Sequence, residues 1–194
     1  MATPPAPPPS PTPASDRTVV LGLGNPVLRD DGVGLAVVSA LRQMLEVAPI
    51  PGVDVLASTR AGFELIELLR DYRRAILVDC LALSDPQPGR VRRLGLDDVS
   101  GSSRLVNAHE VSVGVAFQLA ERMGIRMPTE VEILAIEAGD TCTIAEGLTP
   151  AVEAAVGPLC REIYEDLTRR APATDPPDSE EFRQRRAFYS PDAD

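Results

Sequence analysis

Short apolar segments alternate along the chain with longer segments whose apolar residues recur every three to four positions. The short segments, which predict strands, are the one that ends before Gly22 and residues 53–58, 75–83, 91–96 and 131–137. The periodic segments, which predict helices, are residues 31–45, 62–70, 109–123 and 149–169. This order predicts an α/β fold, a three-layer sandwich in which a mostly parallel, twisted sheet lies between helices.

Two segments refine this picture. Residues 75–83 are almost continuously apolar, which predicts a central strand covered on both faces, whereas residues 91–96 follow a Pro- and Gly-containing loop and suit an edge strand. The last helix should begin at Thr149-Pro150, with Thr149 as N-cap and Pro150 in the first helical position. In such sheets a ligand binds at the carboxyl ends of the strands.

The composition of the two ends sets them apart from the centre. Residues 1–17 consist mainly of Pro, Ala, Ser and Thr, and cannot bury enough apolar surface to fold, so we expect a disordered tail. Residues 171–194 combine prolines with charges and show no apolar face, and we expect a second disordered tail, although a docking role is open. One α/β domain over residues 18–170 remains.

Charge and hydropathy limit the class of partner. The formal net charge of −10 opposes general binding to nucleic acid or to an anionic membrane. We also expect no membrane insertion, because no apolar stretch approaches the roughly 20 residues that span a bilayer. The three cysteines lack metal-binding spacing and their number is odd, so reduced thiols in the cytoplasm are the simplest expectation.

The segment after the first strand is the most informative part of the chain. Gly22 and Gly24 permit a tight turn, and Asp30 and Asp31 come directly before a helix. A dinucleotide site is disfavoured, because the third glycine of the phosphate-binding pattern is missing and two carboxylates would repel a phosphate. This loop suits a cation better than an anion.

Three residues are expected to meet at the carboxyl edge of the sheet: Asp31, Asp79 and the sole histidine, His109. Taken singly, Asp31 and His109 fit ordinary helix-start roles, and Asp79 could bond loop amides. Together, two carboxylates and an imidazole predict a site for a divalent transition metal. Cys80 beside Asp79 is a weaker candidate nucleophile, because a thiol on an apolar strand is more often part of the core.

Four segments give the chain a specific resemblance. They are, in chain order, Gly22-Leu23-Gly24-Asn25 with Asp30-Asp31-Gly32-Val33-Gly34, then Val78-Asp79, His109-Glu110 and Glu146-Gly147-Leu148-Thr149-Pro150. In sequence and order they resemble the hydrogenase maturation proteases, over a region of about residues 18–169.

The resemblance implies a hydrolase, an endopeptidase that removes the C-terminal extension of a nickel-iron hydrogenase large-subunit precursor after nickel insertion. It implies that Asp31, Asp79 and His109 form both the catalytic site and the nickel-binding site. The nickel would be supplied by the substrate, and no organic cofactor is expected. Either Asp31 or Asp79 could accept a proton during hydrolysis, and the sequence does not choose between them.

Two other functions compete. A non-catalytic, nickel-sensing maturation chaperone on the same fold would bind the precursor without cutting it. Peptidyl-tRNA hydrolases share an opening similar to Gly22-Leu23-Gly24-Asn25-Pro26, but that family would require a histidine soon after the opening, whereas the only histidine here is His109 and the chain is acidic.

Overall fold

A five-stranded sheet forms the centre of the protein. The computed structural model describes residues 16–59, 62–100, 113–171, 180 and 183–184. The strands are β1 (Thr18–Leu23), β2 (Val53–Ser58), β3 (Arg74–Leu81), β4 (Val91–Leu94) and β5 (Glu130–Glu137), in the spatial order β2-β1-β3-β5-β4. All neighbouring pairs are parallel except β4, which runs antiparallel to β5 at one edge. The predicted mostly parallel sheet is confirmed.

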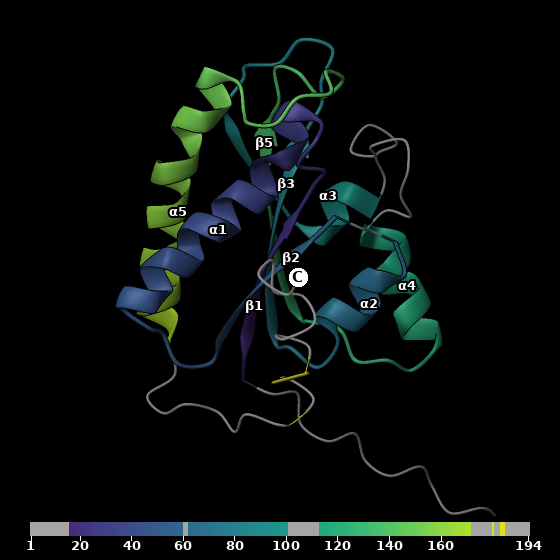
Figure 1. Ribbon diagram of the computed structural model, residues 1–194. Helices are drawn as coiled ribbons and strands as arrows, with labels where there is room; N and C mark the ends of the chain where they lie inside the picture. The colour runs from purple at the N-terminus through teal and green to yellow at the C-terminus, as the bar shows by residue number, and fades with distance from the viewer. Residues whose placement is uncertain (1–15, 60–61, 101–112, 172–179, 181–182, 185–194) are drawn as a thin grey trace, which may run out of the picture.

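Helices cover both faces of the sheet (Figure 1). One face carries α1 (Val33–Val47) and α5 (Pro150–Arg170), and the other carries α2 (Glu64–Leu69), α3 (Leu96–Ser100) and α4 (Val113–Arg122). Each helical layer packs against its own apolar cluster of strand residues. The three-layer sandwich is therefore confirmed. No helix in the described segments is both long enough and apolar enough to cross a membrane.

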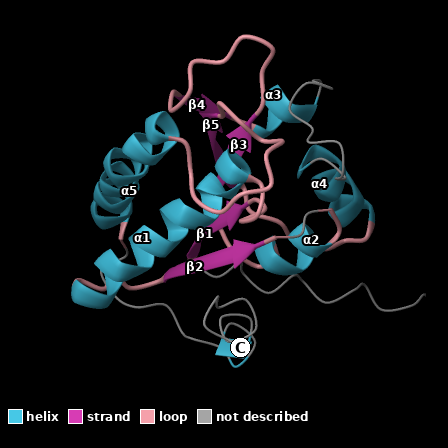
Figure 2. Ribbon diagram, turned by 45° about the horizontal axis from the view of Figure 1, so that its top comes forward, coloured by secondary structure: helices cyan, strands magenta, loops and turns pink. Residues whose placement is uncertain are grey.

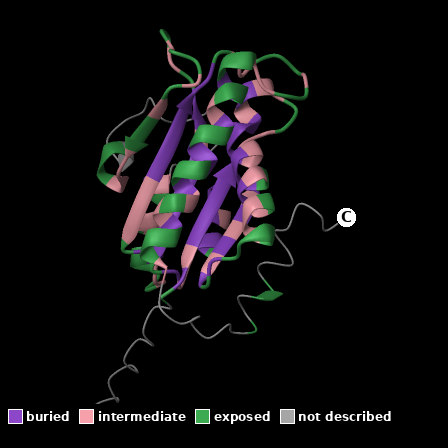
Figure 3. Cartoon of the chain, turned by 90° about the vertical axis from the view of Figure 1, so that its left-hand side faces the viewer, coloured by how far each residue is buried: buried purple, intermediate pink, exposed green. Residues whose placement is uncertain are grey.

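The central position of β3 explains its continuous apolar sequence. It pairs with β1 on one side and β5 on the other, and only Asp79 among its eight residues is not buried. Figure 3 shows the buried strands behind the exposed outer surfaces of α1 and α5. The prediction of a strand covered on both faces is confirmed.

Several element boundaries differ from the prediction by one or more residues, and two of these differences have a clear local cause. A 3-10 turn, η1 (Arg29–Gly32), precedes α1, which starts at Val33 rather than at residue 31. The strand expected over residues 91–96 ends at Leu94, because α3 begins at Leu96. The Asp98 carboxylate accepts the Gly95 N–H at 2.7 Å, a helix-start interaction that favours α3 over a longer strand.

The start of α5 follows the sequence in one respect and departs from it in another. Pro150 occupies the first turn as predicted, but the Thr149 side chain makes no cap hydrogen bond to the helix. Its hydroxyl instead donates to the carboxylate of Asp30, at 2.9 Å. Thr149 is the N-cap residue as predicted, but its hydroxyl does not cap the helix, because a buried carboxylate far away in sequence takes it.

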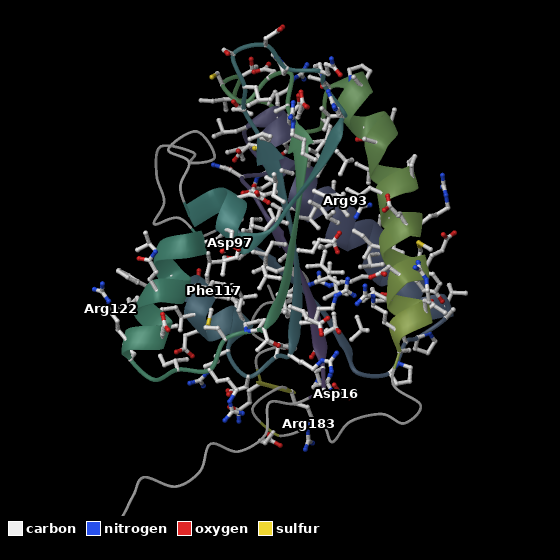
Figure 4. All side chains as sticks on the ribbon, turned by 180° about the vertical axis from the view of Figure 1, so that it is seen from behind. Asp16, Arg93, Asp97, Phe117, Arg122 and Arg183 are labelled. Carbon is white, nitrogen blue, oxygen red and sulfur yellow. The ribbon has the colours of Figure 1, made fainter. Side chains whose placement is uncertain are left out.

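The outer edge of the sheet is tied to α5 by charged side chains. Arg93 on β4 donates to Glu132 of β5 at 2.6 Å and also contacts Glu162 of α5. Figure 4 shows Arg93 on the side of the sheet that faces α5. These contacts hold the antiparallel edge strand in place beside the parallel strands.

Two glycines allow α1 to begin very close to the sheet. A Cβ added to Gly34 would lie 2.2 Å from the Leu23 carbonyl oxygen and 2.3 Å from the Val78 carbonyl oxygen. A Cβ on Gly22 would lie 2.3 Å from the Gly34 carbonyl oxygen. Only glycine permits such an approach. The first turn of α1, and Asp31 before it, are therefore set tightly against the ends of β1 and β3.

Candidate functional site

The loops that follow the parallel strands gather at one edge of the molecule. Figure 2 brings this edge toward the viewer, with the loops after β1, β3 and β5 close together. Backbone hydrogen bonds join the loop after β1 to the loop after β5: Arg29 N–H donates to Ala145 O and Ala145 N–H donates to Val27 O, both at 3.0 Å. This is the carboxyl edge of the sheet, where a ligand site was predicted.

Asp31 is held in a fixed orientation at this edge. One carboxylate oxygen, Oδ2, accepts the backbone N–H of Asn25 at 3.0 Å. The other, Oδ1, accepts the thiol of Cys80 at 3.0 Å. Since Asn25 follows β1 and Cys80 lies on β3, the two hydrogen bonds fix the half-buried carboxylate across the ends of neighbouring strands.

Asp79 lies next to Cys80, near the end of β3. Its Oδ1 accepts the backbone N–H of Cys80 at 2.8 Å, and its side chain is half-buried. Successive strand residues point to opposite faces of a sheet, so Asp79 faces the layer of α2 and α4 while Cys80 packs in the cluster under α1. Asp31 and Asp79 thus reach the same edge of the sheet from its two sides.

The third predicted ligand, His109, lies outside the described residues. Within the described residues, no three His, Cys, Asp or Glu side chains are grouped so that they could hold a metal ion. Asp31 and Asp79 are nevertheless hard oxygen donors of the type that suits a divalent cation. The predicted triad of Asp31, Asp79 and His109 stays a prediction, with two of its three members at the carboxyl edge.

Cys80 has a role that the sequence did not indicate. It is buried, as expected for a cysteine on an apolar strand, and it is one of three free cysteines. Its thiol, however, donates to Asp31. A thiol is a weak hydrogen-bond donor, so this contact orients the carboxylate without neutralising it. Sequence reasoning found no signal for it, because the two residues meet only when η1 packs onto β3.

Asp30 is the functional-site residue whose role the sequence analysis missed. Its carboxylate is fully buried and accepts four hydrogen bonds from the segment that follows β5. The donors are Gly139 N–H at 2.8 Å, Asp140 N–H at 2.9 Å, Thr149 N–H at 2.7 Å and Thr149 Oγ1 at 2.9 Å. All of these donors are neutral. Asp30 therefore joins the loop that carries Asp31 to the segment that leads into α5.

The surroundings of Asp30 favour its charged form. Burial by itself raises the pKa of this carboxyl, but the hydrogen bonds from Thr149, Asp140 and Gly139 outweigh it and lower the pKa below the usual value. The Asp140 carboxylate, in turn, has a lowered pKa because it accepts hydrogen bonds from the hydroxyl and the N–H of Thr143 and from the N–H of Cys142. The loop after β5 is thus ordered by two carboxylates that stay ionised.

Comparisons with known proteins identify the family. The profile of one family, described as hydrogenase maturation protease, matches residues 35–166, more than half of the chain. The chain belongs to the hydrogenase maturation protease family. The matched region includes Asp79 and His109, and it begins just after the loop that carries Asp31. The predicted family and its hydrolase class are confirmed.

Individual relatives agree with this assignment. The chain is 24% identical to the hydrogenase 2 maturation protease of Escherichia coli (strain K12) over 152 residues, which cover 78% of this chain and 90% of the relative. It is similar to the solved structure of the hydrogenase maturating endopeptidase HybD from E. coli, with a TM-score of 0.62, 25% identity, and coverage of 79% and 93%. The maturation protease HybD from Thermococcus kodakarensis shares the fold, with a TM-score of 0.58, 24% identity, and coverage of 78% and 99%.

Proposed function

We propose that this protease removes the C-terminal extension of a nickel-iron hydrogenase large-subunit precursor after nickel has been inserted. Asp31, Asp79 and His109 recognise the nickel, which belongs to the substrate. The observation that carries the proposal is the orientation of Asp31, whose carboxylate is fixed between Asn25 N–H and the Cys80 thiol at the carboxyl edge. Membership of the maturation protease family supports the choice of reaction.

The donor set suits transient contact with a metal held by another protein. Two carboxylates and one imidazole bind nickel less tightly than thiolates do, so the proposed triad would not extract nickel from a thiolate site in the precursor. Asn25 N–H and the Cys80 thiol orient the Asp31 carboxylate at the carboxyl edge, as recognition of a metal held by the substrate requires.

Hydrolysis of the scissile peptide requires two proton movements. A water molecule adds to the carbonyl carbon and loses a proton, the C–N bond breaks, and the leaving nitrogen gains a proton. Asp31 or Asp79 accepts the proton from water in this proposal, because each is a carboxylate at the proposed site. The substrate's nickel supplies positive charge close to the reacting groups.

The proposal is tested by the mass of a purified precursor after incubation with the protein. The precursor is prepared in a nickel-loaded and a nickel-free form, and each is incubated with wild type and with His109→Ala. Loss of a C-terminal peptide only from the loaded precursor, and only with wild type, is the expected result. Cleavage of both forms would contradict nickel recognition. Binding of the loaded precursor with no cleavage would indicate the docking chaperone instead.

A further inference from the structure

Arg29, the first residue of η1, has an unusual backbone conformation at the carboxyl edge. Its φ is 48°, in the left-handed region, where a residue with a Cβ is strained. The other described residues with a positive φ are glycines and Asp71, an aspartate, which tolerates this region better than most residue types. The backbone of Arg29 is fixed there, because its N–H donates to Ala145 O at 3.0 Å. A glycine would adopt this conformation without strain, so the arginine lowers stability at this position.

The guanidinium of Arg29 adds a second cost. Its Nε is buried and makes no hydrogen bond within the described residues, so it has lost water without gaining an acceptor. The nearest carboxylate oxygen, Asp140 Oδ2, lies 3.8 Å away, too far for a hydrogen bond. The two side chains are 36% and 30% exposed, so this ion pair contributes little to stability.

The other arginines with a buried nitrogen that lacks a hydrogen bond are in a different situation. Each has an oxygen close to its guanidinium: Arg42 lies 2.9 Å from Val55 O, Arg70 lies 3.2 Å from Glu67, and Arg74 lies 2.6 Å from Asp166. Arg29 is the member of this group whose guanidinium makes no hydrogen bond to any described residue. Neither of its two costs is offset by a contact in the described part of the chain, so we expect its acceptor on a partner molecule.

The charges around Arg29 indicate what kind of acceptor this is. Asp30 and Asp31 follow it directly, and Asp140 lies on the loop that is joined to it. Asp30 and Asp140 are held in their ionised form by hydrogen bonds. These carboxylates would repel an anion next to Arg29 but would not repel a neutral carbonyl oxygen. The main chain of a peptide supplies such an oxygen at every residue.

We propose that Arg29 is a substrate-binding residue, whose guanidinium donates to a main-chain carbonyl oxygen of the precursor near the scissile bond. This inference rests on the proposed function and deepens it, because it names a contact that holds the precursor chain at the carboxyl edge. The position of Arg29, two residues before Asp31, places this contact beside the proposed site. The strain at Arg29 is then the cost of presenting a guanidinium at a fixed point of the loop.

The test is steady-state processing of the nickel-loaded precursor by Arg29→Ala and Arg29→Gly. Both variants lack the guanidinium, so KM should rise about tenfold or more in each, as expected for the loss of a hydrogen bond from a charged donor. The kcat should change less than about twofold, because the contact is the same before and during the reaction. A KM equal to that of wild type in either folded variant would overturn the proposal.

Comparison of the two variants separates the side chain from the backbone. Glycine relieves the left-handed strain and alanine does not, so the urea midpoint of Arg29→Gly should lie above that of Arg29→Ala. The KM values of the two variants should nevertheless agree. A KM that is raised in only one of them would assign the effect to the backbone of η1 and would contradict a role for the guanidinium.

The matched control is Arg122→Ala, which removes the same charge from the exposed last turn of α4. Its KM should equal that of wild type, and an equally raised KM would overturn a local role for Arg29. Salt identifies the acceptor. The ratio of the KM of Arg29→Ala to that of wild type should be unchanged between about 50 and about 500 mM salt. A ratio that falls towards one at high salt would indicate a carboxylate and contradict the carbonyl contact.

This inference and the proposed function can fail separately. If wild type does not cleave the loaded precursor, the proposed function fails. The dissociation constant of the precursor, measured by calorimetry for wild type and for Arg29→Ala, then tests Arg29 by itself. About tenfold weaker binding by the variant would support the contact, and equal binding would overturn it.

Discussion

The two ends of the sheet stabilise buried carboxylates in different ways. At the amino end, Asp54 is 1% exposed and is paired with Arg17, whose Nε and Nη2 donate at 3.0 and 2.9 Å. The Tyr72 hydroxyl adds a third hydrogen bond at 2.9 Å. At the carboxyl end, Asp30 is 0% exposed, and its four hydrogen bonds come from backbone N–H groups and one hydroxyl.

From this difference we infer that the carboxyl end is the one suited to a cation. A guanidinium beside Asp54 neutralises its charge, so the amino end is a closed structural contact. Neutral donors stabilise the charge of Asp30 without cancelling it. The negative potential of Asp30 and its neighbour Asp31 is therefore retained at the edge where Asp79 also lies. We infer that the amino end serves stability and the carboxyl end serves chemistry.

The largest effect on stability is expected from Gly34→Ala, which changes the packing of α1 against the carboxyl end of the sheet. The added Cβ would meet two backbone carbonyl oxygens, from Leu23 and Val78, neither of which can move without shifting a strand. We expect a loss of more than about 4 kcal/mol of unfolding free energy, or failure to fold, measured by urea denaturation. Gly124→Ala is the control. Its φ of 68° is left-handed but its surroundings are open, so a loss of about 1 kcal/mol is expected.

Next in size is Asp54→Asn, which breaks the ion pair at the amino end. The change leaves the buried Arg17 guanidinium without its counter-charge and should cost about 3 kcal/mol of unfolding free energy. Processing by the folded fraction should stay at the wild-type rate, because the loops that carry Asp30 and Asp31 are at the other end. A reduced rate per folded molecule would argue against the division between the two ends.

Asp30→Asn is the matched change at the carboxyl end. An amide cannot accept on both atoms, so at least one buried N–H loses its partner, at a cost of about 1–3 kcal/mol. For this variant we also expect the processing rate per folded molecule to fall at least tenfold, because the loops around Asp31 lose hydrogen bonds that hold them together. Equal processing by folded Asp30→Asn and Asp54→Asn would remove the distinction between the two ends.

A smaller effect on the unfolding free energy is expected when the pH is lowered. The N–H of Gln87 and then the side chain of Arg92 lower the pKa of Glu137 below 4.5, despite the opposing effect of burial. A lowered folded-state pKa stabilises the protein fully above the unfolded value, and this stability is lost as the pH falls through the folded value. Glu137→Gln should therefore flatten the decline of unfolding free energy below about pH 4.5. An unchanged decline would show that this carboxylate contributes little.

Sequence patterns were sufficient to predict the three layers of the fold and the edge of the sheet at which the candidate site lies. Apolar runs and helical periodicity identified the strands and the main helices, and strand ends identified Asp31 and Asp79. The role of Asp30 could not be predicted, because its donors lie 109 to 119 residues away in the chain. Local rules correctly placed Thr149 at the N-cap of α5, but only the fold shows that its hydroxyl binds Asp30 instead of the helix.

The hydrogen bond between Cys80 and Asp31 is a second interaction that the sequence could not predict. A cysteine on a buried strand is correctly predicted to be in the core, and Cys80 is 7% exposed. Its hydrogen bond to Asp31 depends on how closely η1 approaches β3, which is set by the glycines at Gly22 and Gly34. Local sequence specifies each element, but side-chain partners between elements depend on tertiary packing.

The most direct test of the account is the rate at which Asp31→Asn processes a nickel-loaded precursor. The control is Asp85→Asn, which removes the same charge from an exposed position in the loop after β3. We predict that Asp31→Asn remains folded, with a loss of about 1 kcal/mol of unfolding free energy because its amide cannot accept both hydrogen bonds, and that it loses processing at least a hundredfold, while Asp85→Asn processes at the wild-type rate. Wild-type processing by folded Asp31→Asn would contradict the assignment of the carboxyl edge as the active site.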